Sequence, residues 1–242
     1  MGRRASAASL RSEISCSDEG RGGGTKVPPS GTFTVLGQNA TIIALAALSE
    51  QRERFLREGT LTDVFAVTYF HTTRLIQAAS EAGKFRYPSV VASQQHHFYM
   101  AYTQRRSLPH WQLYLARSEG RALRQGTDPG NLLYGLLQHG MVAHILGDLP
   151  RALHESRPPE LTWPTLAPDF FACDPLFDRA LHATLEDFGH ATGKHCGPLR
   201  TTHREVMELG SWLLCRFGGG TVRLRHLRHT AWKKATLVTF SP

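Results

Sequence analysis

A long apolar run near the middle of the chain constrains the fold more than any other feature. Asn131 to Leu153 reads NLLYGLLQHGMVAHILGDLPRAL and includes His139, His144 and Asp148. Its length and composition predict a buried helix. Polar groups in a buried helix cost free energy unless they are paired with each other or with a ligand. We therefore expect the functional site to lie at His144 and Asp148.

The rest of the chain has the pattern of further helices. Apolar positions recur at helical spacing over 41–57, 62–83, 88–104, 109–125, 174–193, 198–217 and 222–238. Asp128-Pro129 and Asp174-Pro175 each combine a capping residue with a first-turn proline. Pro150 is expected to kink the central helix or end it near Gly147–Leu149. The proline-rich stretch 157–168 is expected to be a loop.

These patterns predict an all-α fold. No convincing strand pattern is visible, and most connections are short, so neighbouring helices should pack roughly antiparallel. We expect a single-domain bundle of seven or eight helices around the buried central helix, formed by residues 35–242. Residues 1–34 are rich in Gly, Ser, Arg and Pro, and they are expected to form a disordered tail.

His144 and Asp148 are four residues apart, so on a helix they share one face. An imidazole and a carboxylate at this spacing can ligate one divalent cation. They can also act as an acid–base pair in which the carboxylate fixes the tautomer of the imidazole. A third interpretation is a structural pair whose members only hydrogen-bond to each other. The residues alone leave all three open.

Two histidines on neighbouring helices are candidates for the same site. His71 lies in an otherwise apolar turn and is expected to be a further catalytic residue. His97 is expected to complete a metal site with His144 and Asp148, and such a set could hold zinc, iron or manganese with an open position. For either lone histidine, the alternative is a core or surface residue with its own partner.

Aromatic side chains on the flanking helices indicate an apolar substrate pocket. The residues expected to line it are Tyr69, Tyr99, Trp111 and His139. His139 is turned by about 140° from His144 around the helix, so the two face one ligand only if the helix is distorted at Gly140. Gly140 and Gly147 each destabilise a helix by about 1 kcal/mol relative to Ala. Close approach of another helix or of a ligand is the expected compensation.

Several enzyme classes are not indicated. The chain has no GxSxG elbow, no HExxH, no P-loop and no GxGxxG after a strand, and its four cysteines form no CxxC pair. Serine hydrolase, zinc protease and nucleotide-driven chemistry are therefore not predicted.

The net charge of +8 is concentrated near the C-terminus. From Lys194 onward there are nine Lys and Arg against two Asp and Glu, a local balance of +7. An acidic carrier protein could dock on this basic C-terminal helix, although a solvated basic face is the alternative. No nucleic-acid motif accompanies the charge, so nucleic acid is not an expected partner. No run reaches the roughly 18 apolar residues of a membrane span, and no secretory signal is visible, so we expect a cytoplasmic protein.

The segment GMVAHILGDLPRAL at 140–153 resembles the signature of a bacterial and fungal family, domain-of-unknown-function family 5995. The resemblance continues in TDVFAVTYFHTTRLI (62–76), FYMAY (98–102), the pair Pro109 and Trp111, and TAWKKATLV (230–238). It implies an all-α fold and a site shared at His144 and Asp148. It does not imply a fixed histidine at His71 or His139. It supplies no reaction, and it suggests specialised metabolism, often actinobacterial, as a setting.

Together these features predict an enzyme that acts on an apolar small molecule in bacterial specialised-metabolite biosynthesis. His144 and Asp148 would supply metal-assisted or acid–base chemistry for a cyclisation, an elimination or a hydrolysis. The alternative is a non-catalytic helical protein that binds a lipid-like ligand and has a structural His144–Asp148 pair.

Overall fold

The fold is all-α, as the sequence predicts. A computed structural model describes residues 31–119, 129–192 and 220–237, and no β-strand occurs among them. The α-helices are α1 (Gly31–Glu58), α2 (Val64–Glu81), α3 (Pro88–Thr103), α4 (Gln112–Ser118), α5 (Pro129–Val142), α6 (Leu149–Ser156), α7 (Trp163–Ala172), α8 (Asp174–Thr192) and α10 (Gly220–Leu237). Short 3₁₀ turns cover Leu61–Asp63, Arg105–Ser107 and Pro109–Trp111.

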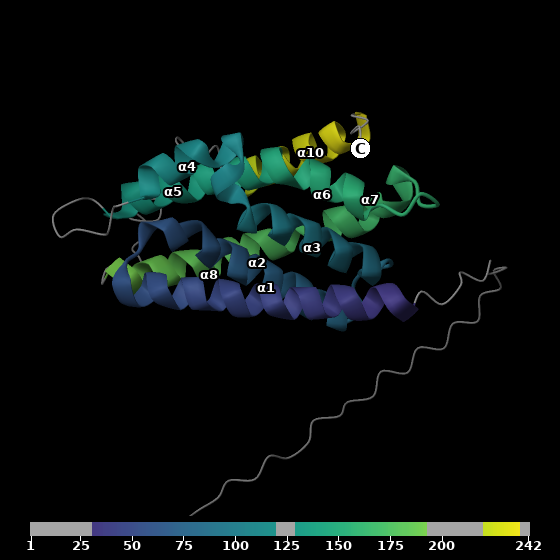
Figure 1. Ribbon diagram of the computed structural model, residues 1–242, viewed down its shortest axis with the longest axis horizontal. Helices are drawn as coiled ribbons and strands as arrows, with labels where there is room; N and C mark the ends of the chain where they lie inside the picture. Colours follow the sequence, from purple (N-terminus) through teal and green to yellow (C-terminus); the bar gives the residue numbers. More distant parts are fainter. Residues whose placement is uncertain (1–30, 120–128, 193–219, 238–242) are drawn as a thin grey trace, which may run out of the picture. The chain divides into compact units, whose positions relative to one another are not determined.

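The helices are arranged so that α2, α3 and α8 lie between two outer groups. In Figure 1, α1 lies on one side of them, and α4, α5, α6 and α10 lie on the other. Of the expected elements, residues 1–30 of the tail and the helix over 198–217 lie outside the described residues. Residues 31–34 were expected to belong to the tail, but they form the start of α1. Within the described part of the chain, no helix has the length and apolar character needed to cross a membrane.

Prolines mark the starts of several helices, and the exception is Pro168, which lies inside α7. Helices α3 and α5 begin at Pro88 and Pro129, and α8 begins at Asp174, as expected. The expected loop over 157–168 is wrong in its second half, because α7 begins at Trp163. A proline in the first turn removes no helical hydrogen bond, so Pro164 favours this start. Pro168 lies inside α7, and burial of Leu166 and Phe170 compensates for the hydrogen bond lost there.

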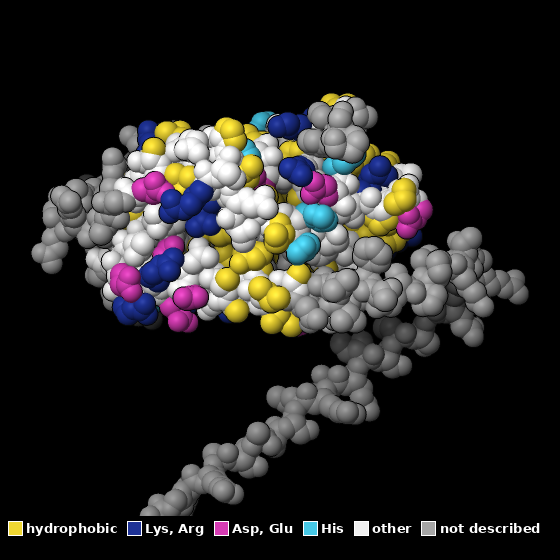
Figure 2. Space-filling model, viewed as in Figure 1, with side chains coloured by type: hydrophobic (Ala, Val, Ile, Leu, Met, Phe, Trp, Pro, Cys, Tyr) yellow, Lys and Arg dark blue, Asp and Glu magenta, His cyan; other side chains and the backbone are white. Residues whose placement is uncertain are grey.

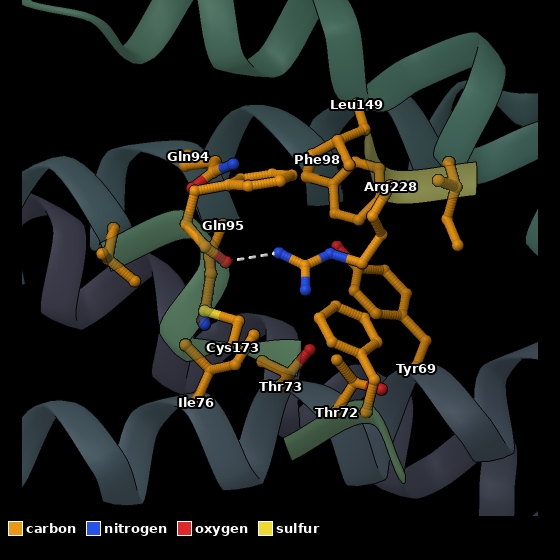
Figure 3. A pocket seen from close by; sticks show the side chains of 14 residues that line it. Tyr69, Thr72, Thr73, Ile76, Gln94, Gln95, Phe98, Leu149, Cys173 and Arg228 are labelled. Carbon is orange, nitrogen blue, oxygen red and sulfur yellow. Dashed lines mark hydrogen bonds between the residues drawn. The ribbon is translucent and has the colours of Figure 1, made fainter. Parts of the chain in front are cut away.

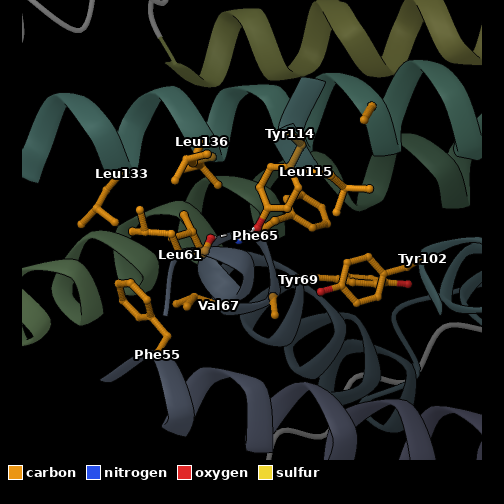
Figure 4. Close-up of a cluster of buried hydrophobic side chains, with 14 of the residues drawn as sticks. Phe55, Leu61, Phe65, Val67, Tyr69, Tyr102, Tyr114, Leu115, Leu133 and Leu136 are labelled. Carbon is orange, nitrogen blue, oxygen red and sulfur yellow. Dashed lines mark hydrogen bonds between the residues drawn. The ribbon is translucent and has the colours of Figure 1, made fainter. Parts of the chain in front are cut away.

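The core is built on aromatic side chains from several helices. Phe65 of α2 is 4% exposed and lies at the centre of this cluster (Figure 4). Its ring packs at 5.3 to 5.9 Å, between centroids, against other buried rings. These rings belong to Tyr69, Tyr102 and Trp111. The contact with Trp111 is edge-on and the other two are tilted, and ring contacts at these distances stabilise a core beyond the burial of apolar area. The cluster fixes α2 against α3 and the 3₁₀ turn before α4.

The central run is one continuous helical segment with a change of register. After α5 ends at Val142, residues Ala143–Asp148 form a π-helix, and α6 follows from Leu149. The Leu149 N–H donates to the carbonyl of His144, five residues back. The expected end near Gly147–Leu149 is therefore wrong, because the α-helix gives way to the π-helix after Val142 and an α-helix begins again at Leu149. A π-turn is wider than an α-turn and is frequent at functional sites.

The widened turn accommodates Pro150. Proline has no N–H to donate and its ring crowds the carbonyl four residues before it. That carbonyl belongs to Leu146, and it accepts a hydrogen bond from Lys234 Nζ of α10 at 3.4 Å. The backbone group freed by the proline therefore has a partner on another helix.

Two glycines of this run allow close approach, as predicted. A Cβ at Gly140 would lie 2.5 Å from Cδ2 of Phe65, and a Cβ at Gly147 would overlap the His110 ring. Both neighbours are parts of packed aromatic groups. The cost of glycine in the helix is offset by these contacts.

Replacing Gly140 with Ala tests this explanation. We expect Gly140→Ala to lower the free energy of unfolding by about 1–3 kcal/mol, because Phe65 has to move. Gly135 lies in the same helix, and nothing lies within 4 Å of a Cβ built there. Gly135→Ala should raise the free energy of unfolding by about 0.5–1 kcal/mol. Urea denaturation of both variants measures the difference, and equal effects would contradict the close-approach role of Gly140.

Candidate functional site

Asp148 is a buried carboxylate that accepts three N–H hydrogen bonds. His144 Nδ1 lies 2.8 Å from Oδ2, and Trp111 Nε1 donates to the same oxygen at 2.9 Å. His110 Nε2 lies 2.6 Å from Oδ1. The donors come from the π-helix and from the 3₁₀ turn Pro109–Trp111. The structural pairing expected of His144 and Asp148 is therefore present, and two further donors join it.

His144 is enclosed by aromatic rings. It is 2% exposed, and its ring stacks on Phe98 of α3 with 3.3 Å between centroids. The Tyr69 ring approaches edge-on at 4.7 Å. The Phe65, Tyr102 and Trp111 rings also lie around it, at 5.2 to 6.0 Å. Its Nε2 is buried and has no hydrogen-bond partner. An unpaired buried nitrogen of this kind costs free energy, so it calls for an explanation.

The surroundings fix the protonation of the pair. Burial lowers the pKa of His144 below its usual value, although the hydrogen bond to Asp148 opposes this shift. Burial would raise the pKa of Asp148, but the hydrogen bonds from His144, Trp111 and His110 outweigh it and hold the pKa below the usual range. At neutral pH the pair is thus a carboxylate and a neutral imidazole. Because Asp148 requires a donor, the proton of His144 resides on Nδ1, and Nε2 carries a free lone pair.

A cavity of about 40 Å³ lies on the other side of two rings that enclose His144, and neither His144 nor Asp148 lines it. Its walls are mostly apolar and come from α2, α3, the π-helix, α6, α7, α8 and α10 (Figure 3). The lining residues that matter here are Tyr69, Phe98, Ile145, Leu149, Cys173 and Arg228. Tyr69 and Phe98 both line the cavity and contact the His144 ring. Among the described residues, these two aromatic side chains belong both to the cavity wall and to the enclosure of His144.

His71 belongs to a different cluster. Its Nε2 lies 2.7 Å from Oδ2 of Asp187 on α8, and Arg52 of α1 forms a two-pronged ion pair with the same carboxylate. Positions 69 and 71 point about 160° apart around α2, so Tyr69 faces His144 and His71 faces away. The sequence interpretation that placed His71 beside His144 is corrected by this pairing.

The expected metal ligands do not converge. His97 forms an ion pair with Glu155 of α6, with 3.1 Å between Nδ1 and Oε2, and about a third of each side chain is exposed. Among the described residues, no group of three or more His, Cys, Asp and Glu is placed to hold a metal ion. His97, His144 and Asp148 are therefore not a common ligand set, because each already serves another contact or faces aromatic rings.

Of the four residues expected to line the pocket, one lines the cavity and three do not. Tyr69 lines the cavity, whereas Trp111 instead donates to Asp148. The Tyr99 ring lies 6.5 Å from the Tyr69 ring and is not part of the cavity wall. His139 directs Nδ1 to the carbonyl of Gly135 in its own helix. Trp111 thus serves the site as a hydrogen-bond donor, a role that its apolar character does not indicate.

Three functional side chains were not predicted from the sequence. His110 and Phe98 touch the His144–Asp148 pair, and Arg228 lines the cavity. Gly147 was the sequence feature that could have indicated a close neighbour such as His110, because a glycine in a helix allows close approach. Nothing in the local sequence pairs Phe98 or Arg228 with the central helix.

The basic C-terminal helix is partly neutralised by the chain itself. Arg225 and Arg228 of α10 form ion pairs with Asp178 and Asp174 of α8. On the face drawn in Figure 2, acidic and basic side chains are interspersed. Lys233 and Lys234 are exposed on α10.

The lowered pKa of His144 gives a testable dependence on pH. Below the usual histidine value of 6.5 the unfolded chain binds a proton at this position and the folded chain does not. Stability from this group is therefore present above pH 6.5 and decreases by up to about 1.4 kcal/mol per pH unit as the pH falls toward the folded-state pKa. His144→Asn keeps an N–H for Asp148 but cannot be protonated. We expect a smaller pH slope of the unfolding free energy in this variant, measured by urea denaturation.

Gly135→Ala provides the control for this measurement, because it changes stability without removing a titratable group. Gly135→Ala should retain the wild-type slope below pH 6.5. Equal slopes in the wild type and in His144→Asn would contradict a neutral buried imidazole at position 144.

Comparison with known proteins places the chain in a family without a described activity. No curated protein and no solved structure matches it. A family model described as a family of unknown function (DUF5995) matches residues 43–241, nearly the whole chain. The resemblance of the segment 140–153 to this family is thereby confirmed. The chain belongs to the DUF5995 family.

Proposed function

We propose that this protein is an enzyme that uses His144 as a general base on a small apolar molecule, with Asp148 as its orienting carboxylate. The observation that carries the proposal is the buried, unpartnered Nε2 of His144, whose ring is separated from an apolar cavity by Tyr69 and Phe98. A hydrogen-bonded carboxylate that fixes the other ring nitrogen is the arrangement that orients histidine bases.

The three donors on Asp148 support this role. The carboxylate stays ionised, so it can stabilise the imidazolium that forms when His144 takes up a proton. Trp111 and His110 hold the carboxylate in place from a second element. Such a supporting shell keeps a catalytic side chain in one orientation.

Tyr69 and Phe98 determine how a substrate would reach His144. Both rings form part of the cavity wall, and Phe98 covers one face of the imidazole. A rotation of the Phe98 side chain would open the cavity toward His144. Burial raises the pKa of Tyr69 well above its usual value, so its hydroxyl remains a hydrogen-bond donor at neutral pH. Proton transfer in a cyclisation, an elimination or a hydrolysis fits these groups.

A binding function without catalysis is the second candidate. The observation in its favour is the enclosure of His144, which is only 2% exposed and stacked on Phe98. In that case the His144–Asp148 pair would be structural, and the cavity alone would hold the ligand. A cavity of about 40 Å³ has room for about three water molecules, so it would take one end of a lipid-like ligand and not its whole chain.

The biological setting is a proposal as well. The specialised metabolism and bacterial cytoplasm expected from the sequence fit an enzyme for small apolar molecules. An acidic carrier protein would meet Lys233 and the other exposed basic groups of α10. Its binding would weaken with rising salt.

Comparison of His144→Asn with the wild type tests the catalytic role. Each purified protein is incubated with a small-molecule extract of bacterial cells, and substrate loss and product formation are followed by mass spectrometry. We expect product with the wild type and at least a hundredfold lower rate with His144→Asn, because general-base catalysis contributes about that much or more.

His71→Asn is the matched control. His71 is also a buried histidine that is hydrogen-bonded to an aspartate and has an unpartnered second nitrogen, but its ring packs on Phe70, which does not line the cavity. His71→Asn should lose stability and keep the activity. Wild-type rates in a folded His144→Asn protein would refute the general-base role, and absence of any turnover with preserved ligand binding would favour the second candidate.

A further inference from the structure

The cavity beside His144 contains a buried guanidinium group. Arg228 extends from α10 into the middle of the lining residues and is 3% exposed (Figure 3). Its guanidinium carbon lies 4.3 Å from the ring centroids of both Phe170 and Phe177. These rings hold it by cation–π contact. The position of its N–H groups is thus defined by packing.

One N–H of this guanidinium has no partner. The two terminal nitrogens donate to the Asp174 carboxylate and, at 2.7 Å, to the carbonyl of Phe170. The Arg228 Nε is buried and makes no hydrogen bond. A buried donor without a partner is costly, and more so in a charged group. A ligand that accepts this hydrogen bond would remove the cost.

The charge around Arg228 selects the kind of acceptor. Asp174 already balances the guanidinium, and most of the cavity wall is apolar. An anionic ligand would bring an uncompensated charge into this environment, which is strongly unfavourable. An uncharged oxygen acceptor meets the free N–H without that penalty.

We propose that the cavity binds a small uncharged carbonyl compound whose oxygen accepts a hydrogen bond from Arg228 Nε. The apolar part of the ligand packs against Tyr69 and Phe98, the two rings that also contact His144. This assignment rests on the proposed function, since it names the substrate class of the same site. The size of the cavity fits a ligand, or the end of a longer one, of a few heavy atoms.

Nuclear magnetic resonance on the wild-type protein tests the proposal directly. The Nε–H signal of Arg228 is followed during titration with acetone, with isobutene, which has the same shape but no oxygen, and with acetate. We expect a saturable shift with acetone and at least tenfold weaker binding of the other two compounds. No substitution of Arg228 is needed, so its ion pair with Asp174 stays intact.

A variant with a filled cavity provides the second measurement. Cys173 lines the cavity and its thiol bonds only weakly, to the carbonyl of Asp169 at 3.5 Å. Cys173→Leu should weaken acetone binding at least tenfold, whereas Cys173→Ala should retain it. His71→Asn should bind acetone with wild-type affinity, because His71 and the Phe70 ring that it packs on do not line the cavity.

Three results would overturn the proposal. They are absence of saturable acetone binding, equal binding of the hydrocarbon without a shift of Arg228, and tighter binding of the carboxylate. None of them bears on proton transfer by His144, which the comparison of turnover with His71→Asn tests separately. Loss of turnover in His144→Asn together with absent ketone binding would retain the general base and reject the carbonyl ligand.

Discussion

The burial of one carboxylate organises this structure. Asp148 is 3% exposed, and an ionised group at that depth is stable only when its oxygens are occupied by donors. Two of its donors, His110 and Trp111, lie in one short turn, and the third, His144, lies in the central helix itself. The carboxylate thereby joins two segments that are separated by more than thirty residues. The close packing of His110 on Gly147 accompanies that connection.

Sequence periodicity predicted the fold because its signals are local. Helical spacing of apolar residues and first-turn prolines at Pro88 and Pro129 depend only on near neighbours, and the helix starts follow them. The pairing of His144 with Asp148 was predictable for the same reason, since both lie on one helix. The error at α7 came from counting Pro164 as a helix breaker, although a first-turn proline favours a helix.

The remainder of the site could not be predicted because it depends on how helices face each other. His71 and Tyr69 are two residues apart, and only the packing of α2 decides which of them meets His144. In the sequence, Arg228 is one of several basic residues in a basic helix. In the structure it is buried against Phe170 and pairs with Asp174. The partner of a long side chain is set by tertiary contacts and not by its neighbours in the chain.

Because of the π-helix, the geometry of this site depends on the presence of one extra residue. In an ordinary α-helix, deletion of one residue rotates everything beyond it by about 100° and disrupts the packing of the next turn. A π-turn contains one surplus residue, so its deletion restores the α register and leaves the following helix in phase. Loss of one residue within Ala143–Asp148 would thus preserve the bundle and remove the His144–Asp148 geometry. Among descendants of a common ancestor, the presence of this extra residue would distinguish chains that retain the site from chains that retain only the scaffold.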